Sequence, residues 1–309
     1  MHPMESISAL FKEFSYRPRK SQGQNFLTDP KILDQIDQAI QCPPGDVLLE
    51  VGGGYGVLTE RLARKGCPLI VIEPDHKLFA MLERKFVKAA NSAEELAQSA
   101  SVEAHHPGPQ LVVSGQAPGV SLVKADILKL DLLPLAPALP AKLTVAGNIP
   151  YYLTTPLITR LLTQYGPSIR KIYLMVQKEV ADRMAARPGT KAYGALTLCA
   201  QYYSVVTKLV DVPSRCFRPA PKVDSAFIEM EMKSVYPLAG EAEKCFFRLV
   251  RAIFQSRRKM LSNSLKSLGK PPDQVEAALK KRGIDPQIRG ERLGLEEFIQ
   301  LSQALEPPL

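Results

Sequence analysis

The chain has 309 residues, of which 45% are apolar and 23% are charged. This composition is that of a globular protein with a sizeable core, it excludes disordered, collagen-like and coiled-coil classes, and the length predicts about two domains. The formal net charge is +9, from 40 basic and 31 acidic residues, which suits a polyanionic partner, and a solvated basic surface is the alternative.

The predicted elements begin with a helix from Pro30, which Thr28 and Asp29 precede and which carries an apolar stripe ending at Ile40. A strand at Val47–Val51, a glycine turn and a helix from Leu58 follow. The remaining predicted elements are a strand at 69–72, a helix at 78–86, strands at 122–123, 143–146 and 172–176, and a closing strand pair at 205–212 and 225–232. Strands that are apolar on both faces and alternate with helices predict an α/β fold with a parallel sheet covered on both sides.

Two segments interrupt this pattern. Residues 89–121 are rich in Ala, Ser, Gly and Pro and lack aromatic residues, so we interpret them as an insertion that ends in a surface loop. Beyond residue 234 the pattern is helical only. We therefore predict a catalytic domain over residues 1–234 and a smaller all-helical domain over residues 235–309.

The helical region is the more basic part of the chain. From Lys233 to Leu309 it has 14 basic and 9 acidic residues, a balance of +5, which leaves +4 for the longer remainder. Residues 244–268 are predicted to form a helix with an apolar stripe and a basic stripe, the latter comprising Lys244, Arg248, Arg251 and Arg258. Such a helix suits RNA docking, and a solvated surface helix is the alternative.

Metal, redox and membrane functions have little support. The five cysteines are scattered without a C-x-x-C pair, and only His105 and His106 are adjacent histidines, so we expect no metal. The uncharged run from Leu143 to Thr159 contains Asn148, Pro150 and Pro156 and is too short to cross a membrane. Residues 1–16 resemble neither a signal nor a transit peptide, so we expect a cytoplasmic protein. We also expect a monomer.

The first chemical motif is the glycine cluster Gly52, Gly54 and Gly56. Backbone N–H groups at a strand-to-helix turn can bind a nucleoside ligand, and an acid at the next strand end can accept bonds from ribose hydroxyls. The spacing G-x-G-x-G is one residue shorter than the dinucleotide pattern and, with Glu50, resembles the class I methyltransferase fingerprint. Glu73 could then bind the ribose hydroxyls of S-adenosylmethionine, and Asp126 its adenine amino group. The alternative is that the glycines only form tight turns for packing.

The second motif is Asn148-Ile149-Pro150-Tyr151, at the end of the fourth predicted strand. The lone pair of an exocyclic amine on a base is delocalised into the ring. The side-chain oxygen of Asn148 and the carbonyl oxygen of Ile149 can accept hydrogen bonds from the two N–H groups of the amine. These bonds favour a tetrahedral nitrogen. Pro150 stiffens the turn, and the ring of Tyr151 can stack on an unstacked adenine.

With these motifs in place, the chain resembles the KsgA family of small-subunit ribosomal RNA adenine dimethyltransferases along nearly its whole length. The segments that carry the resemblance are Gln24-Asn25-Phe26-Leu27, Glu50 to Gly56, Val71-Ile72-Glu73, Asp126, Asn148 to Tyr151, Gln177 to Val180, Tyr193-Gly194, Phe217 to Ser225, Gln255 to Lys259, and Asn263-Ser264-Leu265. The resemblance implies a Rossmann-like S-adenosylmethionine-dependent enzyme. Its implied reaction is dimethylation of N6 on two adjacent adenines near the 3′ end of 16S rRNA, during ribosome biogenesis.

The resemblance also implies roles for individual residues. Cofactor contacts would come from Asn25, Leu27, Gly52, Glu73, Asp126 and Asn148, while Tyr151 and Phe217 would flank the target adenine. Arg257 and Lys259 join the expected RNA-binding residues, and the implied partner is the immature small subunit. One departure is Gly53, where many relatives carry Pro or Ala, and from it we expect added flexibility.

Four other functions compete with this interpretation. A DNA adenine methyltransferase uses a related motif with proline where Ile149 stands, and an NAD oxidoreductase would leave Asn148 to Tyr151 without a role. A large-subunit rRNA methyltransferase shares the N-x-P-Y chemistry but fits the segment Phe217 to Ser225 less well. A non-catalytic ribosome assembly factor should show a broken motif, whereas the glycine cluster, Glu73, Asn148 and Tyr151 are intact.

Overall fold

The computed structural model of the protein describes residues 11–19, 23–86, 119–136, 140–255, 257 and 259–305. Its centre is a seven-stranded sheet of order β4-β3-β2-β5-β6-β9-β7, beside a two-stranded sheet of β1 and β8. The pairs β2–β3, β2–β5, β3–β4 and β5–β6 are parallel. The predicted α/β fold with a parallel sheet is confirmed.

The bounds of the strands are β1 Phe26–Leu27, β2 Val47–Val51, β3 Leu69–Ile72, β4 Val120–Val123, β5 Leu143–Asn148, β6 Ile169–Gln177, β7 Ser204–Val212, β8 Phe217–Arg218 and β9 Ser225–Met232. The bounds of the α-helices are α2 Pro30–Ala39, α3 Val57–Leu62, α4 His76–Phe86, α6 Tyr151–Tyr165, α7 Lys178–Met184, α8 Ala195–Tyr203, α9 Gly240–Gln255, α10 Leu261–Leu265, α11 Pro272–Lys281 and α12 Leu295–Leu305.

Most of the predicted strands lie at or near their predicted bounds. β5 extends two residues beyond the predicted end, so Asn148 is the last residue of the strand. The prediction of one helix over 244–268 is wrong, because α9 ends at Gln255 and α10 begins at Leu261. The extended backbone of Met260, which forms a bridge with Arg289, separates the two helices.

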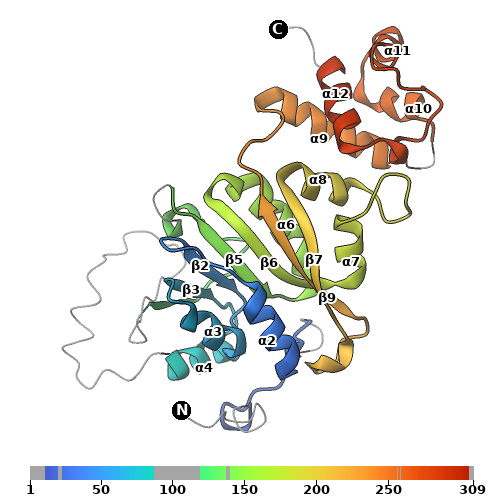
Figure 1. Ribbon diagram of the computed structural model, residues 1–309. Helices are drawn as coiled ribbons and strands as arrows, with labels where there is room; N and C mark the ends of the chain where they lie inside the picture. Colours follow the sequence, from blue (N-terminus) through green and yellow to red (C-terminus); the bar gives the residue numbers. More distant parts are fainter. Residues whose placement is uncertain are drawn as a thin grey trace. The chain divides into compact units, whose positions relative to one another are not determined.

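Helices α2, α3 and α4 cover one face of the sheet, and α6 covers the other (Figure 1). Buried residues of the first three helices form one cluster with alternate strand residues, including Ile36, Leu62, Leu82, Leu48 and Leu69. These residues follow the helical and strand periodicities of the sequence, which is why the layers form as predicted.

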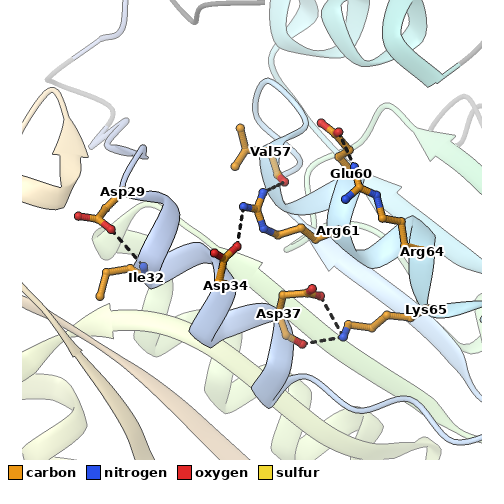
Figure 2. Close-up of polar contacts among 9 residues, drawn as sticks. All are labelled: Asp29, Ile32, Asp34, Asp37, Val57, Glu60, Arg61, Arg64 and Lys65. Atoms are coloured by element: carbon orange, nitrogen blue, oxygen red, sulfur yellow. Dashed lines mark hydrogen bonds and ion pairs between the residues drawn. The ribbon is translucent and has the colours of Figure 1, made fainter. Parts of the chain in front are cut away.

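Ion pairs fasten α2 to α3 and to the 3-10 helix η2 (Ala63–Lys65) that follows it (Figure 2). Nη2 of Arg61 lies 3.1 Å from Oδ1 of Asp34, and Nζ of Lys65 lies 3.0 Å from Oδ1 of Asp37. Asp29 caps the start of α2 by accepting the N–H of Ile32 at 3.1 Å. The two ion pairs thereby tie α2 to the helix that follows the glycine turn and to η2.

The chain divides into two compact units, residues 1–178 with 208–229, and residues 179–207 with 230–309. In the second unit, Tyr202 stacks on Phe246 with ring centroids 4.8 Å apart, and Tyr203 stacks on Phe247 at 5.7 Å. These rings explain why residues 179–207 group with the C-terminal helices. The functional division at residue 234 stays a prediction, and of the predicted insertion only residues 119–121 belong to the described part of the chain.

Candidate active site

A cavity of about 1150 Å³ opens in the first unit, at the carboxyl ends of the parallel strands. Residues that follow β2, β3 and β4 line it together with the end of β5. Ligands of open α/β sheets bind at this edge. The predicted site residues that line the cavity are Asn25, Leu27, Gly52, Gly54, Glu73, Asp126, Asn148, Ile149 and Pro150.

The glycine turn is organised around the carboxylate of Glu73. Oε2 of Glu73 accepts the N–H of Gly54 at 2.9 Å, and Oε1 accepts the N–H of Asp75 at 2.9 Å. Gly54 has φ +57°, a conformation that side chains other than glycine adopt at a cost. A Cβ at this position would also lie 3.3 Å from the Phe26 ring. The turn therefore depends on glycine to expose its backbone to the cavity.

Gly53 lies against side chains of the core. A Cβ built on Gly53 would lie 2.5 Å from Cγ1 of Val71 and 2.9 Å from Cδ1 of Leu82. The backbone of this turn therefore packs directly against the core, and the added flexibility stays a prediction.

Two buried carboxyl groups lie next to each other under the turn. Glu73 is 4% exposed, and burial raises its pKa to about 7. Glu50 is 1% exposed, and burial raises its pKa to about 8. Among the described residues, Oε2 of Glu50 has no hydrogen-bond partner. Burial of a charge without full compensation favours the neutral form, so both groups titrate near neutral pH.

Asn148 presents its amide to the cavity in one orientation. Its Nδ2 donates to the carbonyl of Asn25 at 3.2 Å, an assignment that follows from the hydrogen-bond network. The donor end is thus occupied, and the carbonyl end is left as an acceptor. Gly147 allows this placement, since a Cβ there would lie 2.5 Å from the carbonyl oxygen of Val51 on the neighbouring strand.

Pairing of β1 with β8 brings two distant segments together. Leu27 lies opposite Phe217, and Phe26 lies opposite Arg218, in an antiparallel register. Thr28 adds a bond from its N–H to the carbonyl of Cys216 at 2.9 Å. Asn25 and Leu27 are thereby fixed at the cavity wall.

Three predicted site residues do not line the cavity. Gly56 precedes α3 as its N-cap, with φ +85°, and its N–H donates to the carbonyl of Gly53 at 2.9 Å. The hydroxyl of Tyr151 lies 2.7 Å from Oγ of Ser225, and burial raises the pKa of Tyr151. The ring of Phe217 is completely buried in the core, so it offers no face to a base in this conformation. Stacking by Tyr151 and Phe217 stays a prediction.

One exposed aromatic side chain at the cavity is a residue that the sequence analysis did not name. Tyr152 lines the cavity and is 63% exposed. Its position directly after the N-x-P-Y motif could have identified it from the sequence. Tyr16 and Gln24 also line the cavity and bond to each other, with the hydroxyl of Tyr16 2.8 Å from Oε1 of Gln24.

Comparison with known proteins places this site in a family. The family described as Ribosomal RNA adenine dimethylase matches residues 16–96 and 110–306. The chain belongs to this family. The match confirms the expected resemblance, the class of enzyme and the methyltransferase fold, and the substrate class of the family is ribosomal RNA.

Relatives of this dimethylase family member cover nearly its whole length. A Ribosomal RNA small subunit methyltransferase A from Moorella thermoacetica is 40% identical over 306 residues, 96% of each chain. The protein of that name from Clostridium acetobutylicum is 35% identical over 296 residues, again 96% of each.

Two solved enzyme structures share the fold of this chain. A dimethyladenosine transferase from Plasmodium falciparum has a TM-score of 0.69 and 24% identity, covering 89% of this chain and 95% of that chain. The 23S rRNA methyltransferase ErmE has a TM-score of 0.64 and 25% identity, covering 91% and 99%.

The basic residues predicted for RNA binding in this dimethylase are unequal in their surroundings. Nε of Arg257 pairs with Oε2 of Glu291, while Nη1 and Nη2 donate to the carbonyls of Lys191 and Thr190 at 2.8 and 2.9 Å. Lys244 pairs with Glu241 at 2.6 Å. Arg248, Arg251 and Lys259 are exposed, and Arg258 lies outside the described residues. Arg257 therefore acts as a structural clamp that joins Glu291 to residues 190–191.

Within the described ranges no group of three or more potential ligands could hold a metal ion. Likewise, no described helix has the length and hydropathy needed to cross a bilayer.

Proposed function

We propose that this enzyme transfers methyl groups from S-adenosylmethionine to N6 of two adjacent adenines near the 3′ end of 16S rRNA, two to each base, in the immature small subunit. The names of the relatives from Moorella thermoacetica and Clostridium acetobutylicum, and their 35–40% identity to this chain, support the small-subunit substrate. The 25% identity to ErmE makes a large-subunit substrate the weaker candidate. The proposal includes a cytoplasmic monomer that needs no metal.

The residues at the cavity fit S-adenosylmethionine. Gly52 and Gly54 present their backbone at the turn, and Glu73 presents carboxylate oxygens to the ribose hydroxyls. Asp126 would accept a hydrogen bond from the adenine amino group. Oδ1 of Asp126 accepts the N–H of Leu128 at 3.0 Å, which fixes the carboxylate at the end of β4. Asn25 and Leu27 would close the site. When bound, the cofactor supplies an electrophilic methyl group.

The orientation of Asn148 is the observation that carries the mechanism. With Nδ2 held by Asn25, Oδ1 is the atom available to accept one N–H of the target amine. The carbonyl of Ile149 would accept the other, and Pro150, at the start of α6, fixes that part of the turn. Two acceptors favour a tetrahedral nitrogen whose lone pair is no longer delocalised into the ring. Catalysis then consists mainly of positioning the amine.

Substitution of Asn148 tests this role. Asn148→Ala removes the acceptor, and we expect methyl transfer to fall by about 100-fold or more, as for other single polar groups that stabilise a transition state. Binding of S-adenosylmethionine and of subunits is measured in parallel. Gln164→Ala, an exposed amide on α6 outside the cavity, is the matched control. A normal rate for Asn148→Ala with a folded protein would remove Asn148 from the mechanism.

A further inference from the structure

A second cavity, of about 410 Å³, lies within the second unit. One face of α9 forms a wall of it, with Arg248, Arg251 and Gln255 at helical spacing above the buried Cys245 and Ala252. Leu268 and Lys270, which follow α10, and Leu305 at the end of α12 complete the lining. Three cations from two separate segments thus meet at one hollow.

The lining carries an unbalanced positive charge. None of the described residues that line it is acidic. Among the described residues, the side chains of Arg251 and Lys270 form none of the ion pairs found elsewhere in the unit, and Arg248 lies only near Glu241, whose carboxylate is paired with Lys244. Three like charges at one concavity repel one another unless an anion lies between them.

The surroundings distinguish these cations from the other basic residues of the same helix. Arg257 is held by Glu291 and two carbonyls, and Lys244 is held by Glu241. Arg248, Arg251 and Lys270 retain their N–H donors for a ligand. Guanidinium groups form paired hydrogen bonds with phosphate oxygens, and the amide of Gln255 adds a neutral donor.

We propose that this cavity is a phosphate-binding site that receives a backbone phosphate of the small-subunit RNA. The inference rests on the proposed function for the identity of the RNA. It adds Lys270 to the expected RNA-binding residues, and it assigns Arg257 a structural role. The chemistry at the site is ionic and sequence-independent, so it positions the enzyme on the RNA without reading bases.

The test compares two triple variants of equal charge change. Arg248→Gln/Arg251→Gln/Lys270→Gln empties the cavity of cations, and Lys280→Gln/Lys281→Gln/Arg282→Gln removes three exposed cations at the end of α11 outside it. Binding of inorganic phosphate is followed by calorimetry, and binding of unmethylated small subunits is measured from low to high salt. Thermal melting confirms that each variant is folded.

We expect saturable phosphate binding in the wild type and the α11 variant, and none in the cavity variant. Subunit binding by the cavity variant should weaken more than that of the α11 variant, and its slope of log affinity against log salt should fall by about one, as for one lost phosphate contact. Loss of phosphate binding with subunit affinity equal to that of the α11 variant would assign the cavity to a free phosphate compound and overturn the RNA proposal. Absence of saturable phosphate binding in the wild type would overturn the site.

Methyl transfer at saturating subunit concentration separates this proposal from the proposed function. The cavity variant should change the KM for subunits more than kcat, because the cavity lining contains none of the active-site residues. Failure of the wild type itself to methylate subunits would refute the proposed function, whereas the phosphate titration would still test the cavity.

Discussion

The titration of Glu73 predicts a pH-dependent affinity for the adenosine part of the cofactor. Burial raises the pKa of Glu73 to about 7. A ribose hydroxyl donates to the ionised carboxylate, so binding favours that form and raises the ionised fraction. At pH 6 about one tenth of the free protein is ionised at Glu73, and at pH 8 about nine tenths is ionised. Affinity should therefore rise by up to about 10-fold from pH 6 to pH 8.

Adenosine is the probe for this measurement, because it has the ribose hydroxyls but lacks the amino acid part of the cofactor. Calorimetry at half-unit pH steps gives the profile. Glu73→Gln should bind more weakly and flatten it, since one amide oxygen cannot accept from both Gly54 and Asp75. Glu50→Gln controls for the neighbouring carboxyl, whose pKa is raised to about 8. A flat wild-type profile, or an affinity that falls as the pH rises, would refute the assignment of Glu73 to the ribose.

Three further predictions concern stability and substrate binding. Because burial raises the folded-state pKa of Glu50 above that of the unfolded chain, stability should fall as the pH rises from about 4.5 to 8, and Glu50→Gln should make this fall shallower in melting experiments. Tyr152→Ala should raise the KM for subunits by the loss of stacking, worth about 1–3 kcal/mol per base, whereas Tyr152→Phe should keep the wild-type KM; equal values for both variants would contradict stacking. Arg257→Ala should lower the free energy of unfolding by about 1–2 kcal/mol, because three polar contacts are lost at a partly exposed site, and an unchanged unfolding curve would refute the clamp.

The sequence predicts the central sheet well because its strands are apolar on both faces. β2, β3 and β9 lie at the predicted bounds, and the Asp29 cap forms as the residue type indicates. The glycine turn, Glu73 and Asn148 meet at one cavity because the carboxyl ends of parallel strands share one edge. Local pattern and sheet topology suffice for these features.

Other features depend on long-range contacts that spacing does not encode. Arg257 belongs to a basic run, yet Glu291 and the carbonyls of Thr190 and Lys191 occupy its guanidinium. Phe217 lies in the segment expected at the target base, but pairing of β8 with β1 buries its ring. The break between α9 and α10 likewise follows from the bridge at Met260 rather than from the amphipathic pattern, which continues across it.

Methyl transfer from labelled S-adenosylmethionine to small subunits that lack this modification tests the central claim most directly. The subunit RNA is digested after the reaction, and the labelled nucleoside is identified. The proposed function predicts N6-dimethyladenosine from two adjacent positions near the 3′ end of the small-subunit RNA. Cofactor binding without label in that RNA, or label only in large-subunit RNA, would contradict it.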